Sequence, residues 1–167
     1  MKIVITDSKT ISDDSSFFEP LREMGELVLY DLSKKEQIPE RIREADVVLC
    51  NKTALGREEL QNATNIKYIG LFATGFNNID TEYTNEHGIT VCNAGSYSTE
   101  AVAQHTFALI LNHFSRILDY ANFVKQDGWK ESKVFSPFVY PLFELTGKNL
   151  GIVGYGSIGK RVSEIGQ

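Results

Sequence analysis

Three glycines near the end of the chain have the spacing of a phosphate-binding turn. Gly154, Gly156 and Gly159 form a GxGxxG pattern, in which each glycine has a physical purpose. The first permits a tight turn, the second lets a pyrophosphate approach the backbone, and the third lets a helix pack closely against a strand. The pattern therefore predicts a dinucleotide-binding turn, and a tight turn without a ligand is the alternative.

The segments on both sides of this turn favour the dinucleotide interpretation. Asn149–Val153 is expected to form a strand. Apolar residues then recur at helical spacing at Ile158, Val162 and Ile165. The free N–H groups at the start of that helix, including those of Ser157 and Ile158, would bind the phosphates. The acidic residue that contacts the ribose is expected about 20 residues beyond the motif, so this sequence does not distinguish NAD from NADP.

A second group of polar residues follows two of the predicted strands. A glycine-containing turn at Thr74 and Gly75 follows one strand, and such a turn can point several N–H groups at one anion. Lys52 follows another strand at the same edge of the sheet, where its ammonium group could contact a carboxylate. The alternatives are an ordinary turn, for which Asn77 and Asn78 are typical residues, and a solvated surface lysine.

Short apolar runs alternate with helical patterns in the first part of the chain. The expected strands are Lys2–Thr6, Glu26–Tyr30, Asp46–Cys50, Ile66–Phe72 and Ile89–Cys92. The expected helices are Phe17–Met24, Lys34–Ala45, Glu58–Ala63 and Thr81–His87. Apolar strands separated by helices indicate a parallel sheet that is covered on both faces. The prediction is an α/β fold, with a flavodoxin-like doubly wound domain over residues 1–98.

A long helix is expected next, over Thr99–Tyr120. Its stretch Phe107–Leu111 is apolar nearly all round, which is typical of a helix buried between two domains or two subunits. An aromatic loop over Trp129–Phe143 follows it. Residues 99–146 are therefore interpreted as an inter-domain helix and loop, and residues 147–167 as the start of a truncated Rossmann domain.

Composition narrows the classes of function. The 167 residues have a net charge of −5, which argues against nucleic acid or an anionic membrane as a partner. No apolar run has the length of a membrane span, and no cluster of His and Cys suggests a metal site. Cys50 and Cys92 are expected to be buried free thiols in a reducing compartment, so the cytoplasm is the expected location.

From Leu71 onwards the sequence resembles the D-isomer-specific 2-hydroxyacid dehydrogenases. The resemblance rests on Ala73–Asp80, His87–Asn93, Ser98–Thr106 and Leu145–Gly156, which occur in the family's order. The glycerate dehydrogenase (hydroxypyruvate reductase) branch is the most similar, through Asn51-Lys52, Gln104–Thr106 and Tyr140–Leu145. The resemblance implies hydride transfer between NAD or NADP, with NAD favoured, and a small 2-keto or 2-hydroxy acid. It also implies a homodimer.

The resemblance assigns roles to particular residues. Backbone N–H groups at Thr74 and Gly75 would hold the substrate carboxylate, and Thr74 would also approach the cofactor. Thr106 matches a position close to the nicotinamide, although a helix threonine can instead bond back to its own helix.

The family's catalytic histidine, glutamate and arginine would lie beyond residue 167, and His105 is read as structural. We therefore expect no catalytic residue in this chain and no dehydrogenase activity from it alone. The alternative is a flavodoxin-like binding or oligomerisation module without such activity.

Overall fold

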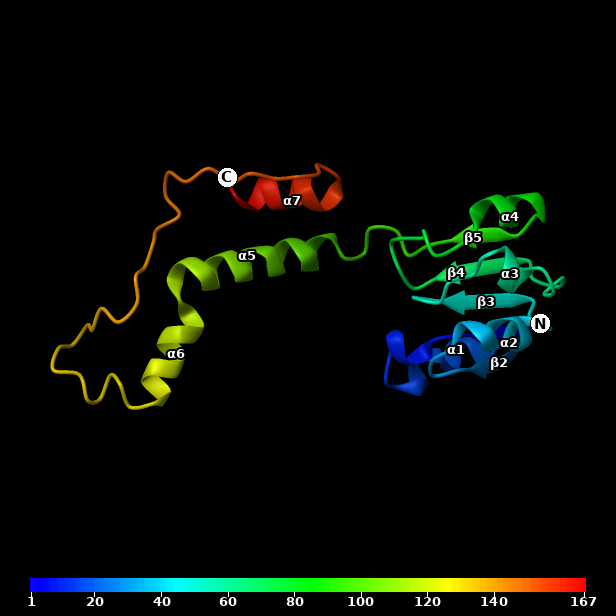
Figure 1. Ribbon diagram of the computed structural model, residues 1–167, viewed down its shortest axis with the longest axis horizontal. Coiled ribbons are helices and arrows are strands. Elements are labelled where there is room, and N and C mark those ends of the chain that lie inside the picture. Colours follow the sequence, from blue (N-terminus) through cyan, green and yellow to red (C-terminus); the bar gives the residue numbers. More distant parts are fainter. The chain divides into compact units, whose positions relative to one another are not determined.

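The computed structural model describes all residues from Met1 to Gln167 (Figure 1). The chain forms two compact units, Met1–Gly95 and Ser96–Gln167, called unit 1 and unit 2 below. No helix in either unit combines the length and the apolar character that crossing a membrane would need.

Unit 1 contains a five-stranded parallel sheet with the order β2-β1-β3-β4-β5 (Figure 1). The strands are β1 (Lys2–Ile5), β2 (Glu26–Leu29), β3 (Val47–Cys50), β4 (Tyr68–Leu71) and β5 (Thr90–Cys92). In the register of the central strands, Val4 of β1 pairs with Val48 of β3, which pairs with Ile69 of β4. All three side chains are buried, as expected for strands inside a parallel sheet. The predicted α/β fold class and flavodoxin-like strand order are confirmed.

The helices of unit 1 are shorter than the sequence pattern indicated. They are α1 (Glu19–Arg22), α2 (Ile38–Ile42), α3 (Arg57–Leu60) and α4 (Thr81–Glu86). In place of the predicted starts at Phe17 and Lys34, the 3₁₀ turns Ser15–Phe18 and Lys35–Gln37 precede α1 and α2. Pro20 and Pro39 lie in the first turns of those α-helices. A proline has no N–H group to donate, so it is accommodated at the start of an α-helix and not inside one.

The main apolar core of unit 1 joins the sheet to α2, α3 and α4. It contains side chains from the strands, such as Val48 and Ile69, together with Ile42 and Leu60 from the helices. Cys50 is part of this core, whereas Cys92 is exposed, so the prediction that both thiols are buried is wrong for Cys92. Cys92 is near the end of the edge strand β5, where no further strand covers it.

Unit 2 consists of three helices and long connecting segments. The helices are α5 (Thr99–Ser115), α6 (Ile117–Lys125) and α7 (Ser157–Ile165). The predicted single helix Thr99–Tyr120 is therefore wrong, because the chain breaks at Arg116, which adopts a left-handed conformation with φ 52°. The side chain of Asn112 accepts the backbone N–H of Leu118 at 3.1 Å. This local bond competes with the continuous pattern of helical hydrogen bonds.

The segment Asn149–Val153, predicted as a strand, has no strand assignment in the structure. A strand needs a neighbour with which to exchange backbone hydrogen bonds, and unit 2 contains no other strand. The apolar stretch of α5 is also less buried than expected, since Leu109 is 58% exposed. Within unit 2, α7 is linked to α5 by Arg161, whose Nε lies 3.0 Å from Glu100 Oε2.

The core of unit 1 can be tested with two matched leucine substitutions. Leu60 is 1% exposed, so Leu60→Ala should leave a cavity and lower the free energy of unfolding by about 2–5 kcal/mol. Leu32 is 61% exposed, so Leu32→Ala should change it by less than about 0.5 kcal/mol. Urea unfolding followed by far-ultraviolet circular dichroism measures both values. Equal midpoints for the two variants would contradict the packing described here.

Candidate functional site

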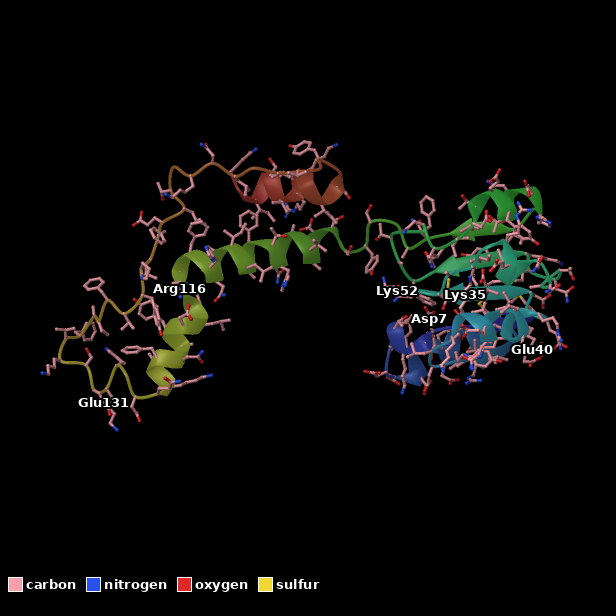
Figure 2. All side chains as sticks on the ribbon, in the orientation of Figure 1. Asp7, Lys35, Glu40, Lys52, Arg116 and Glu131 are labelled. Atoms are coloured by element: carbon pink, nitrogen blue, oxygen red, sulfur yellow. The ribbon has the colours of Figure 1, made fainter.

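The carboxyl ends of the strands in unit 1 bring several polar loops to one edge of the sheet. Because the strands are all parallel, the segments that follow β1, β3, β4 and β5 lie at this edge. Figure 2 shows Asp7, which follows β1, close to Lys52, which follows β3. The side chain of Lys52 is exposed. This edge therefore carries both the cation of Lys52 and the turn that contains Thr74 and Gly75.

The most connected residue at this edge is Asp7, which the sequence analysis did not single out. Its side chain is buried, at 3% exposure. One carboxylate oxygen accepts the backbone N–H groups of Lys52 at 2.6 Å and Thr53 at 2.9 Å. The N–H of Asn51 donates to the other oxygen at 3.0 Å. Three consecutive N–H groups of the loop after β3 thus converge on one carboxylate.

Other side chains tie the same loop to its neighbours. The amide of Asn51 donates to the carbonyl of Thr10 at 2.8 Å. The hydroxyl of Thr6 donates to that of Thr53 at 2.9 Å. The amide of Asn78, in the segment after β4, donates to the carbonyl of Thr53 at 2.7 Å. The loop after β3 is consequently bound both to the end of β1 and to the segment after β4.

The turn at Thr74 and Gly75 is held from its other side. The hydroxyl of Thr74 donates to the carbonyl of Gly95 at 2.7 Å, and the amide of Asn93 donates to the carbonyl of Thr74 at 2.6 Å. The backbone N–H groups of Thr74 and Gly75 donate to no acceptor in the chain, and both residues are exposed. These N–H groups are therefore available to an anion at the sheet edge.

The buried carboxylate also affects its neighbour Cys50. Burial, and then the negative charge of Asp7, raise the pKa of the Cys50 thiol to about 12. A thiol with such a pKa stays protonated near neutral pH, so Cys50 is a packing residue and not a nucleophile.

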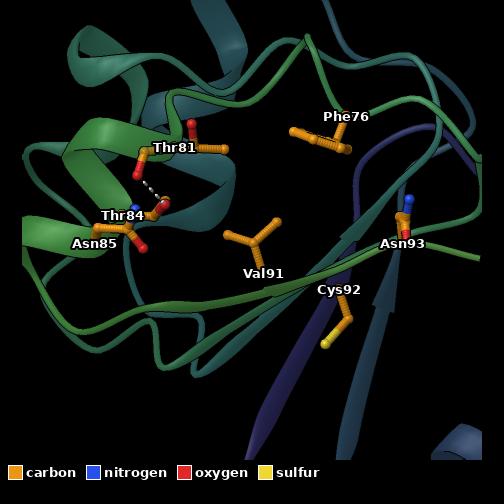
Figure 3. Close-up of a pocket in the computed structure, with 7 residues that line it drawn as sticks. All are labelled: Phe76, Thr81, Thr84, Asn85, Val91, Cys92 and Asn93. Carbon is orange, nitrogen blue, oxygen red and sulfur yellow. Dashed lines mark hydrogen bonds between the residues drawn. The ribbon is translucent and has the colours of Figure 1, made fainter.

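A pocket of about 460 Å³ lies between α4 and β5 in unit 1 (Figure 3). It is lined by Phe76, Thr81, Thr84, Asn85, Val91, Cys92 and Asn93. None of the predicted site residues lines it. Phe76 and Asn93 connect it to the edge described above, because they belong to the segments that follow β4 and β5.

In unit 2 the glycine motif forms a tight turn at the start of α7. Gly154 has φ +92°, a conformation that side chains rarely allow. A methyl group on Gly159 would overlap the carbonyl oxygen of Gly154, whereas one on Gly156 would meet no atom within 4 Å. Gly156 occupies the N-cap position of α7, and no side chain caps that helix. The first N–H groups of α7 are therefore open to an external acceptor.

A second pocket, of about 580 Å³, lies over this turn. All the residues of unit 2 that the sequence predicted for cofactor binding line it: Thr106, Gly154, Gly156, Ser157, Ile158 and Gly159. The hydroxyl of Thr106 donates to the carbonyl of Val102 at 2.8 Å, so the bond back to its own helix is present. The residue nevertheless lines the pocket.

His87 has the surroundings of a structural residue. His87 lies at the end of α4, where its Nδ1 is 2.9 Å from the carbonyl oxygen of Tyr83. Its ring stacks on that of Tyr83 with 3.9 Å between centroids. His105 lies on α5 with an exposed side chain.

Sequence reasoning missed the residues that hold the edge together, Asp7, Asn78 and Asn93. A signal for Asp7 was present, since it is an acidic residue directly after the predicted apolar strand Lys2–Thr6. Carboxylates in such places lie at the ligand-binding edge of an open parallel sheet.

Comparison with known proteins agrees with this geometry. Residues 3–158 match the family described as D-isomer specific 2-hydroxyacid dehydrogenase, catalytic domain. Hydroxypyruvate reductase of Blautia hydrogenotrophica is 36% identical over 170 residues, which cover 100% of this chain and 53% of that protein.

Two solved structures extend the comparison. D-lactate dehydrogenase from Aquifex aeolicus, complexed with NAD and lactic acid, has a TM-score of 0.79 at 27% identity, over 98% of this chain and 47% of that one. An acyclic imino acid reductase in complex with NADPH and D-Arg has a TM-score of 0.80 at 27% identity. The match covers 99% of this chain and 52% of the reductase chain. The chain spans about half the length of these proteins. It belongs to the D-isomer specific 2-hydroxyacid dehydrogenase family.

Proposed function

We propose that this chain is the front part of an NAD(P)-dependent dehydrogenase that interconverts a small 2-keto acid and its D-2-hydroxy acid, with hydroxypyruvate and glycerate as the favoured pair. Unit 1 supplies the binding edge for the substrate carboxylate, and unit 2 supplies the start of the cofactor site. The remaining part of the protein supplies the residues that transfer the proton.

One observation supports the cofactor assignment above all others. The residues of the glycine turn and Thr106 come from segments far apart in the sequence, yet they line a single pocket. The uncapped N–H groups of α7 fit an anionic phosphate, because the start of a helix is a partially positive site. The open space above Gly156 fits the close approach of a pyrophosphate to the backbone.

At the other site, residues of unit 1 would bind and orient the acid. The exposed ammonium group of Lys52 would contact the substrate carboxylate, and the unpaired N–H groups of Thr74 and Gly75 would donate to it. The cofactor, with NAD favoured, supplies the hydride when it is bound. Fixing the carboxylate in this way orients the neighbouring carbon for the reaction, which is how positioning residues accelerate a bimolecular step.

The proposal extends to the cellular location and the oligomeric state of the enzyme. We place it in the cytoplasm, where reducing conditions keep thiols such as Cys50 and Cys92 free. We also propose a homodimer, which is supported by the apolar side chains that unit 2 exposes, such as Phe135 at 84% and Phe138 at 95%.

Activity measurements on two forms of the protein test the proposed function. We expect the complete protein to oxidise NADH with hydroxypyruvate, and the 167-residue chain alone to show no such activity. NADPH, glyoxylate, pyruvate and phosphohydroxypyruvate are compared in the same assay. Activity of the 167-residue chain would contradict the proposed division of roles. A complete protein that reduces none of these acids with either cofactor would instead favour a binding or oligomerisation module.

The cofactor turn can be tested with a matched pair of glycine substitutions. Gly159→Ala places a methyl group against the backbone of Gly154, which should destabilise the docking of α7 by about 1–3 kcal/mol. The methyl group added by Gly156→Ala meets no atom within 4 Å, so this variant should destabilise the docking of α7 by less than about 1 kcal/mol. The rate of trypsin cleavage after Arg161, which lies within α7, measures the opening of the helix. Equal rates for both variants would show that the turn does not need the third glycine.

A further inference from the structure

We propose that Asp7 is a positioning residue, which holds the loop Asn51–Thr53 so that Lys52 presents its ammonium group to the substrate carboxylate. The inference rests on the proposed function of the sheet edge. It concerns a residue that would not itself touch the substrate.

The hydrogen bonds of Asp7 hold the loop after β3 in place. Its carboxylate receives the backbone N–H groups of Asn51, Lys52 and Thr53, and the shortest of these bonds, at 2.6 Å, comes from Lys52 itself. Hydrogen bonds to an ionised acceptor are about twice as strong as neutral ones. The backbone of Lys52 is therefore fixed, whereas its side chain extends into solvent.

The burial of this charge needs an explanation, and the loop provides it. A buried carboxylate usually requires a cation or several hydrogen bonds to offset its lost hydration. The Asp7 carboxylate takes part in none of the ion pairs of the chain, so no charged side-chain nitrogen of arginine, lysine or histidine lies within 4.0 Å of it. Its partners are the three N–H groups of the loop and, at 3.4 Å, the hydroxyl of Thr6. The nearby ammonium group of Lys52 thus remains free to bind an external anion.

The same loop joins the two parts of the proposed substrate site. Thr53 receives a hydrogen bond from Asn78 at 2.7 Å, and Asn78 belongs to the segment that contains Thr74 and Gly75. Fixing the loop with Asp7 therefore fixes the backbone of Lys52, from which the ammonium group extends, relative to the segment with the unpaired N–H groups. A carboxylate bound by both would lose affinity if either were displaced.

A double-mutant cycle separates this role from other roles of Asp7. The probe is tartronate, a stable 2-hydroxy dicarboxylate, titrated at constant ionic strength into the ¹⁵N-labelled 167-residue chain. Its dissociation constant is obtained from the amide shifts of Thr74 and Gly75. The variants are Asp7→Asn, Lys52→Met and the double variant. Each single variant should bind about three- to fivefold more weakly, and the double variant no more weakly than Lys52→Met.

Each other outcome has a distinct meaning. Unchanged binding by Asp7→Asn, or further weakening when it is added to Lys52→Met, would overturn the inference and leave the proposed function intact. A carboxylate that acts only as a nearby negative charge would give the opposite effect, with Asp7→Asn tightening binding in both backgrounds. Unmodified chain that does not bind tartronate at tens of millimolar would contradict the proposed substrate edge, and the inference with it.

Two further measurements control for folding. Asp46→Asn is the matched control, because Asp46 accepts the N–H of Lys2 at the opposite end of β3, and it should leave tartronate binding unchanged. In Asp7→Asn the amide proton of Lys52 should shift upfield while the resonances of β1 and β3 stay in place. If this variant does not fold, Asp7→Ser is measured by the same criterion. Failure of both to fold would assign Asp7 to the fold and overturn the positioning role.

Discussion

The carboxylate of Asp7 is bound by three backbone N–H groups of the loop after β3, and the rest of the sheet edge is arranged around this interaction. Because β1 and β3 are neighbours in the sheet, a short acidic side chain at the end of β1 reaches the loop that follows β3. Loops at the carboxyl edge of a parallel sheet lack the regular hydrogen bonds of the strands, so they need such partners to keep one conformation.

This constraint explains how a chain with a net charge of −5 could bind an anionic acid. The proposed site needs no basic surface. It would use one exposed cation, the ammonium group of Lys52, and the N–H groups of Thr74 and Gly75, which have no partner in the chain. The glycine turn of unit 2 follows the same principle, since no side chain caps the N–H groups at the start of α7 and they are open to an external acceptor. In both units backbone donors are held open by the local fold.

Much of the fold could be predicted from the sequence, because apolar runs such as those of β1 and β3 have no other interpretation in an alternating α/β pattern. The helix ends could not, since Pro20 and Pro39 determine where regular helix begins and the bond from Leu118 to Asn112 interrupts the long helix. The prediction of a strand before Gly154 was wrong for another reason. A strand needs a neighbouring strand with which to form hydrogen bonds, and a local sequence pattern does not reveal one.

The candidate site likewise contains residues that the sequence could predict and residues that it could not. Residues with a motif, such as Gly156 and Gly159, were predicted, whereas Asp7 was not, because its role depends on bonds to residues more than forty positions away. Amide hydrogen exchange in the unmodified chain tests the central interaction most directly. The account predicts that the N–H groups of Asn51, Lys52 and Thr53 exchange as slowly as those of β3. Exchange at the rate of an unstructured loop would contradict it.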